Sequence, residues 1–288
     1  MKRNGNNFIA LFSAVLMALL MMLLLAGPAH AQSVFFDDFN YTSSSDPTLL
    51  NFGWAPRSGG GGPGIGTWDP THITFIPDPA NSSNQLMQMA ATSSGTASTS
   101  IQTEILTPFA FLHGTTAARV KFADAPDTGP DGDQLYQTFF TISPNRSRPY
   151  SEMDFEYLPN GYGSVTTPHF FFTLWQTTHK NVSLNIAASY AGWHTLLVDD
   201  ADGVHTHFYV DGVLVYTASV YYPAATMAID FNQWFPTGSL VNSSTPRTWL
   251  EQIDWVYHAK DTLLTTAQVE SNVAAYRTQG VVRVNTVF

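Results

Sequence analysis

The protein has 288 residues and a formal net charge of −10 at neutral pH, and only 12% of its residues are charged. It contains no cysteine, which excludes disulfide bonds and a lipid-modified cysteine. The acidic balance, without a basic run after the N-terminal segment, disfavours nucleic acid and anionic membrane surfaces as partners, and neutral substrates fit better.

Residues 1–31 have the pattern of a secretory signal peptide. Lys2 and Arg3 form a short basic region, and almost unbroken apolar sequence follows from Phe8 to Ala26. Ala29 and Ala31, with His30 between them, suit a cleavage site, so we expect an exported protein whose mature form starts at Gln32. An uncleaved anchor is the alternative, because the apolar run is long enough to span a bilayer. After cleavage we expect no membrane contact, since no other segment is as apolar.

Residues 32–262 are predicted to be β-structure throughout. Runs rich in Val, Ile, Thr, Phe and Tyr are separated by Gly, Pro, Asn, Asp and Ser. Asp211-Gly212 lies between HTHFYV and VLVYT and predicts a tight hairpin, because this pair tolerates positive φ. Many strands without helices between them indicate an all-β sandwich of two sheets.

Two segments differ from this pattern. Ser58–Gly66 is glycine-rich but lacks the Lys-Ser/Thr of a phosphate-binding loop, so we interpret it as a flexible surface loop. Thr265–Gly280 is the one predicted helix, because Thr265 and Gln268 form a capping-box pattern and Gly280 can end the helix. Residues 263–288 are therefore expected to form a helical tail that packs on the sandwich.

Three carboxylates occupy alternate positions in SEMDFEYLPNG, which spans Ser151–Gly161. Alternate residues of a strand share a face, so Glu152, Asp154 and Glu156 point one way and the apolar residues between them point to a core. The outer two lie roughly 13 Å apart along the backbone. A concave sheet would bring their carboxyl groups to the separations of glycosidase acid pairs, but the spacing does not choose between retention and inversion.

The crowding of these acids has an electrostatic consequence. Three carboxylates this close do not all ionise cheaply, so we expect at least one raised pKa. Glycoside cleavage needs such a split, with one carboxylate charged and another protonated. The alternative interpretation is a solvated strand face that is merely acidic, because perturbed clusters mark functional sites only in some proteins.

The same stretch resembles the Glu-x-Asp-x-Glu signature of family 16 glycoside hydrolases, which include lichenases, laminarinases and xyloglucan endotransglycosylases. It has the form without an extra bulge residue and is most similar to the lichenase-like branch. Other stretches resemble family motifs in the same order along the chain, namely Phe35–Phe39, Gly192–Asp200, Phe208–Gly212, Asn232–Trp234 and Ile253–His258.

The resemblance implies a concanavalin A-like jelly-roll sandwich of two antiparallel sheets with a short C-terminal helix. It implies that 32–262 is a catalytic domain with Glu152 as nucleophile, Glu156 as general acid/base and Asp154 as a hydrogen-bonding partner of the nucleophile. The implied activity is that of a secreted, endo-acting, retaining β-glucanase that requires no cofactor. A transglycosylase on the same scaffold and a non-catalytic, lectin-like sandwich are the alternatives. The polysaccharide and its linkage stay open.

Further site residues follow from the resemblance. Trp175 and Trp234 are candidates for stacking on sugar rings, and Asn232 is a candidate for hydrogen bonding to the sugar. Asp254 matches a family position that often helps to bind a structural Ca²⁺, which would need more oxygen ligands to complete the site. We expect a polysaccharide as the only partner and a monomeric protein.

Four residues stand apart from these assignments. Asp200 follows Asp199 where family members usually carry Trp, and we expect this to remove one sugar-stacking position. Leu106 stands where Arg is common. His205 and His207 share a strand face and could bind a metal ion, but no third ligand is visible in the sequence, so we interpret them as ordinary surface or groove histidines.

Overall fold

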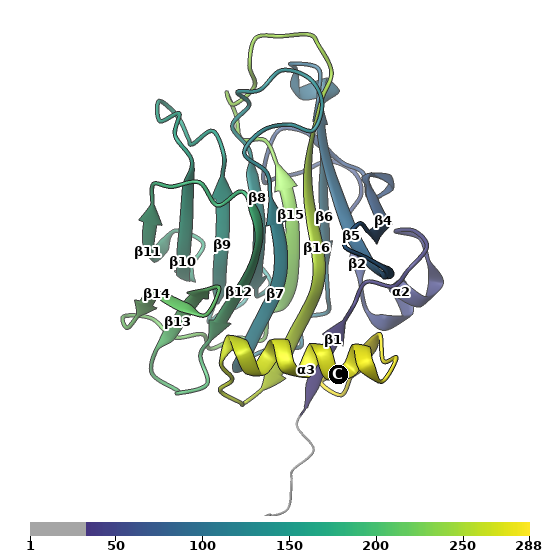
Figure 1. Ribbon diagram of the computed structural model, residues 1–288. Coiled ribbons are helices and arrows are strands. Elements are labelled where there is room, and N and C mark those ends of the chain that lie inside the picture. Colours follow the sequence, from purple (N-terminus) through teal and green to yellow (C-terminus); the bar gives the residue numbers. More distant parts are fainter. Residues whose placement is uncertain (1–32) are drawn as a thin grey trace, which may run out of the picture. The chain divides into compact units, whose positions relative to one another are not determined.

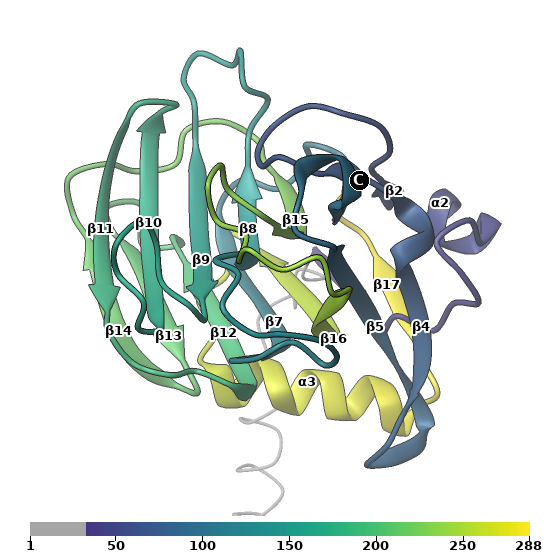
Figure 2. The same cartoon turned by 90° about the horizontal axis from the view of Figure 1, so that it is seen from above.

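Two almost entirely antiparallel sheets stacked face to face form the body of the protein, as Figures 1 and 2 show. The computed structural model describes residues 33–288, which make one unit. The predicted signal peptide and the expected mature start at Gln32 lie outside the described residues.

Strand β16 lies at the centre of the first sheet and pairs with three other strands. Its strands run in the order β4 (Ile73–Asp78), β5 (Asn81–Ser93), β16 (Arg247–Lys260), β7 (Gly114–Phe122), β12 (Gly192–Asp199), β13 (Thr206–Val210) and β14 (Val213–Ala218). Strand β1 (Val34–Asp37) also pairs with β16 and carries β17 (Arg283–Asn285) on its other edge.

The second sheet holds the carboxylate strand near its middle. Its order is β2 (Ala55–Pro56), β6 (Ile101–Leu106), β15 (Ala228–Trp234), β8 (Tyr136–Ile142), β9 (Glu152–Leu158), β10 (His169–Thr177) and β11 (Lys180–Ile186). The short β3 (Thr67–Trp68) pairs in parallel with β6. The remaining elements are α2 (Pro47–Phe52), α3 (Thr266–Thr278) and the 3₁₀ turns η1 (Pro70–His72) and η2 (Ala97–Thr99).

The core between the sheets is made by the inward face of each strand. On β9, Met153, Phe155 and Tyr157 lie in this core, while the three carboxylates face the other way. The alternation expected from the sequence is therefore confirmed, and so is the two-sheet jelly-roll sandwich. The Asp211-Gly212 turn joins β13 to β14 with φ values of 50° and 78°, which explains the choice of Asp-Gly there.

Helix α3 lies across the outer face of the first sheet, in front of β7 and β16 in Figure 1. The Thr265 hydroxyl accepts a hydrogen bond from the Gln268 backbone N–H, as the capping-box pattern predicts. Val269 and Val273 are buried against the sheet, which confirms the predicted helix. The tail is not only helical, because the chain after α3 returns as β17. Among the described residues, no helix has the length and apolar character needed to span a bilayer.

Candidate active site

A cleft of about 530 Å³ lies on the outer face of the second sheet. Strands β9, β8, β15 and β6 form its floor, and β10 contributes a tryptophan. Its polar and aromatic lining includes the predicted residues Glu152, Asp154, Glu156, Trp175, Asn232 and Trp234. The structure thus brings together residues that the sequence spreads over more than 80 positions.

The carboxylate triad is held by hydrogen bonds from two aromatic side chains. The Tyr150 hydroxyl donates to Glu152 Oε2. Trp175 Nε1 donates to Asp154 Oδ2 at 2.6 Å, and Trp175 is directly opposite Glu152 on the neighbouring strand. The second oxygen of Asp154 is buried without a hydrogen-bond partner among the described residues. Each acid of the triad therefore has different surroundings.

These surroundings separate the pKa values of the triad. Burial raises the pKa of Glu152 to about 7, although the hydrogen bond from Tyr150 opposes the increase. Burial and the nearby charge of Glu152 raise the pKa of Glu156 to about 8. Burial raises the pKa of Asp154 well above its usual value, and the charges of both glutamates add to this. The hydrogen bond from Tyr150 favours the charged form of Glu152, whereas no side chain among the described residues donates to Glu156, and this difference suits an acid/base pair.

The other predicted binding residues lie on the same face. Thr138 Oγ1 donates to Asn232 Oδ1 at 2.7 Å, which fixes the amide and leaves its NH₂ group for a ligand. Trp234 stacks on Tyr136 with ring centroids 4.2 Å apart, so one face of the indole is covered and its orientation is fixed. Trp175 contacts the triad through its N–H, which gives it a second role besides the predicted stacking.

The sequence analysis missed an ionic group at one end of the cleft. Arg57 Nη1 lies 2.5 Å from Glu104 Oε2, and the Arg57 guanidinium covers the ring of Trp68. Asp230 is buried beside this pair, and burial together with the charge of Glu104 raises its pKa. The position of Asp230 could have been predicted from the sequence. Alternate residues of a strand share a face, so Asp230 must lie on the same face of β15 as Asn232 and Trp234.

The sequence analysis also missed two parts of the cleft rim, a glycine-rich segment and an exposed aromatic ring. Gly62 and Pro63, from the segment interpreted as a flexible surface loop, line the cleft, and the Gly62 carbonyl accepts a hydrogen bond from Arg57. That segment is therefore a wall of the cleft. Phe109 also lines it and is 44% exposed, which suits a ring that receives a ligand.

The two departures from the family pattern have different outcomes. Asp200 lies outside the cleft, where its carboxylate accepts hydrogen bonds from the Gly114 backbone N–H and binds the His113 ring at 3.0 Å. The expectation that position 200 removes a sugar-stacking ring from the cleft is therefore wrong. Leu106 does line the cleft, and Arg57 supplies the guanidinium there from a different segment.

The contacts of Asp254 do not fit a calcium ion. Its Oδ1 accepts hydrogen bonds from Arg277 Nη2 at 2.6 Å and from Asn84 Nδ2 at 2.7 Å. Arg277 also binds Asp38, and Arg119 lies 3.6 Å from the other oxygen of Asp254. A cation bound by these oxygens would meet the guanidinium of Arg277, so the side chain occupies the place of the ion.

We expect Arg277→Met to lower the free energy of unfolding by roughly 2–4 kcal/mol, because among the described residues it leaves Asp38 without a counter-charge and Asp254 with Arg119 alone, at 3.6 Å. Urea unfolding measures this, with the exposed Arg146→Met as the control. Calcium should not change the unfolding midpoint of the wild type. It should partly restore the midpoint of Arg277→Met, because the carboxylate oxygens of Asp38 and Asp254 no longer bind the Arg277 guanidinium in this variant. A midpoint of the wild type that rises with calcium would contradict this assignment.

Known proteins resemble this chain in sequence and in fold. The sequence matches glycosyl hydrolases family 16 over residues 67–257, a region that includes the carboxylate strand. No curated protein matches the sequence. Among solved structures, the Bacillus licheniformis β-glucanase is 20% identical, with 80% of this chain and 100% of that chain covered and a TM-score of 0.59.

Two further structures share the fold at lower identity. A laminarinase from Flavobacterium sp. UMI-01 is 17% identical, with 79% and 100% of the two chains covered and a TM-score of 0.54. An enzyme named as a galactohydrolase of galactose-4-sulfate–3,6-anhydro-D-galactose is 15% identical, with 82% and 97% covered and a TM-score of 0.53. The structural likenesses show the fold, and the sequence match covers most of the sandwich. The chain therefore belongs to the glycosyl hydrolases of family 16.

Proposed function

We propose that this protein is an endo-acting, retaining glycosidase that cleaves neutral β-linked glucans. The observation that carries the proposal is the triad on β9, where Glu152 receives a hydrogen bond and Glu156 has a higher pKa in the same cleft. The β-glucanase and the laminarinase of similar fold support the choice of glucans.

In the first step, Glu152 attacks the anomeric carbon as a carboxylate. The hydrogen bond from Tyr150 stabilises its charged form, which favours this residue as the nucleophile. The bond from the anomeric carbon to the leaving oxygen breaks, and Glu156 donates its proton to that oxygen. The products of this step are a shortened glucan and a glycosyl ester on Glu152.

In the second step, Glu156 is a carboxylate and takes a proton from a water molecule, whose oxygen attacks the anomeric carbon. The ester bond breaks and restores the Glu152 carboxylate, so two inversions retain the β configuration. Asp154 lies between the two glutamates and is held by Trp175. Burial and the charges of both glutamates raise its pKa and so favour its protonated form, which can donate a hydrogen bond to a neighbouring carboxylate.

The charge of the cleft favours a neutral substrate. Its lining carries the carboxyl groups of Glu104, Glu152, Asp154, Glu156 and Asp230. Arg57 is the basic residue among the described residues of this lining, and it is paired with Glu104. A sulfated chain would meet these charges without a free guanidinium or ammonium group to bind it. The substrate of the galactohydrolase with the same fold is therefore disfavoured here.

A panel of polysaccharides tests this proposal. We expect reducing ends from mixed-linkage β-glucan or laminarin, released as oligosaccharides, and none from a 4-sulfated galactan. The anomeric configuration of the first product, followed by proton NMR, should be β. Addition of acceptor oligosaccharides separates a hydrolase from a transglycosylase. Polysaccharide binding without any cleavage would instead support the lectin-like alternative.

We also propose that the protein is exported, on the strength of the basic and apolar pattern in residues 1–31. The N-terminal sequence of the protein recovered outside the cells should then begin at Gln32. Recovery of the chain from Met1 in a membrane fraction would instead indicate an uncleaved anchor.

A further inference from the structure

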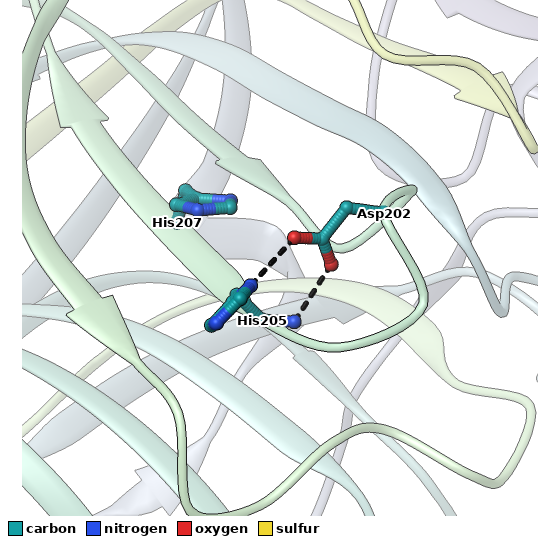
Figure 3. Close-up of side chains that lie close together, drawn as sticks. All are labelled: Asp202, His205 and His207. Carbon is teal, nitrogen blue, oxygen red and sulfur yellow. Dashed lines mark hydrogen bonds and ion pairs between the residues drawn. The ribbon is translucent and has the colours of Figure 1, made fainter.

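A cluster of two histidines and an aspartate lies on the first sheet, far in sequence from the carboxylate strand. His207 is on β13, His205 immediately precedes this strand, and Asp202 is in the turn after β12. Figure 3 shows the Asp202 carboxylate and the His205 ring directed at each other, with the His207 ring beside them. The alternate residues Thr206 and Phe208 are buried in the other direction, so the histidines face away from the core.

One ligand atom from each of these residues lies within 4.8 Å of the others. Ligand atoms of a tetrahedral zinc ion are about 3.4 Å apart, given bonds of about 2.0–2.1 Å. The widest pair must therefore close by about 1.4 Å. Rotation of side chains can supply this, because those of Asp202 and His205 are 32% and 38% exposed.

A second observation concerns the orientation of the His207 ring. Its Nδ1 is buried and makes no hydrogen bond within the described residues, but it lies 3.5 Å from the almost completely buried carboxylate of Asp199, which leaves Nε2 as the nitrogen that can bind an ion. A carboxylate in this position orients a histidine that binds a metal and adds negative charge behind it.

Hydrogen bonds from the backbone fix the position of the Asp202 carboxylate. Its Oδ1 accepts hydrogen bonds from the N–H groups of Val204 and His205, both at 2.7 Å, and its Oδ2 accepts one from the His205 ring. These bonds hold the carboxylate in the turn with one oxygen directed at the His205 ring. Together with Asp199 it can balance the charge of a divalent ion.

We propose that Asp202, His205 and His207 form a binding site for a divalent transition-metal ion of the zinc type. Two imidazole nitrogens and one carboxylate oxygen suit zinc, whereas calcium and magnesium prefer oxygen ligands alone. A water molecule can complete four-coordination. The ion ties the turn between β12 and β13 to the strand that follows it, so its role is structural, and it is independent of the proposed glucanase activity.

Calorimetric titration of metal-stripped, tag-free protein with Zn²⁺ at pH 7.5 tests the site. We expect one saturable site, and roughly 100-fold or more weaker binding in His207→Gln and in Asp202→Asn. Saturating Zn²⁺ should raise the melting temperature of the wild type but not that of His207→Gln. Circular dichroism shows that each variant is folded before titration.

The matched control is His194→Gln, because His194 also pairs with an aspartate, Asp211, at 2.7 Å but has no second histidine beside it. This variant should bind Zn²⁺ as the wild type does. The absence of saturable binding, or equal affinity in the wild type and in His207→Gln, would overturn the proposal. Hydrolysis of glucan should be the same in His207→Gln and in the wild type, so failure of this site and failure of the proposed function give different results.

Discussion

Glu152→Ala should reduce the hydrolysis of β-glucan by roughly 10⁴-fold or more, because removal of a nucleophile stops the covalent step. The fold should persist, since the Glu152 side chain lines the cleft rather than the core. Rates are measured with the polysaccharide that the wild type cleaves best. The melting temperature checks that the variant is folded.

Azide identifies what Glu152 does. With an aryl β-glycoside of the preferred sugar, azide can enter the space left by Glu152→Ala and displace the aryl group with one inversion. The expected product is an α-glycosyl azide, which NMR distinguishes from the β form. Glu104→Ala removes another carboxylate of the same cleft and should give no glycosyl azide. Hydrolysis at the wild-type rate in Glu152→Ala would refute the assigned role.

Glu156→Ala should slow polysaccharide cleavage by roughly 10²–10⁴-fold, the usual contribution of a general acid. The loss should be much smaller in the first step with an aryl leaving group that needs no proton. Azide should then attack the glycosyl ester on Glu152, and a second inversion gives the β-glycosyl azide. An α-glycosyl azide from this variant would instead indicate that Glu156 is the nucleophile and Glu152 the acid/base.

The pH profile provides an independent check on Glu156. The proposed mechanism requires Glu152 ionised and Glu156 protonated, so activity should be greatest between the two pKa values, about 7 and about 8. It should fall at lower pH as Glu152 gains a proton, and at higher pH as Glu156 loses one. In Glu156→Gln the alkaline decrease should disappear, because the residue no longer titrates.

The same raised pKa values affect stability. Glu156 binds its proton more tightly in the folded state, so its contribution to stability is complete below its ordinary pKa and is lost as pH rises towards about 8. The free energy of unfolding should therefore decrease across this range in the wild type. The decrease should be smaller in Glu156→Gln when both proteins are unfolded with urea at several pH values.

The elements that could be predicted from the sequence are those marked by a pattern of residues close together in the chain. Strand β9 alternates acids with core residues, and one face of the strand follows from this period alone. The helix α3 was predictable from its capping box, and the β13–β14 turn from Asp211-Gly212. In each case the residues that carry the signal are within a few positions of one another.

What the sequence did not reveal depends on contacts between distant segments. Asp230 is opposite Leu106 across the β15–β6 pair, so the acidic end of the cleft exists only after these strands meet. Asp202 is near His207 in sequence, but it lies in a turn without a period to relate it to the strand. The ring orientation of Trp175 depends on its bond to Asp154 on the adjacent strand. Pairing and turn geometry, rather than composition, decide these positions.

The guanidinium of Arg277 lies between Asp38 and Asp254, so the fold does not need a cation from solution to balance these two carboxylates. An ion must be captured from solution, so its stabilising effect depends on its concentration relative to its dissociation constant. A cation attached to α3 has instead a fixed effective concentration at these carboxylates. The fold therefore does not depend on a supply of calcium at this position, but it depends on an intact C-terminal segment, and a protease that removes α3 would also remove the counter-charge.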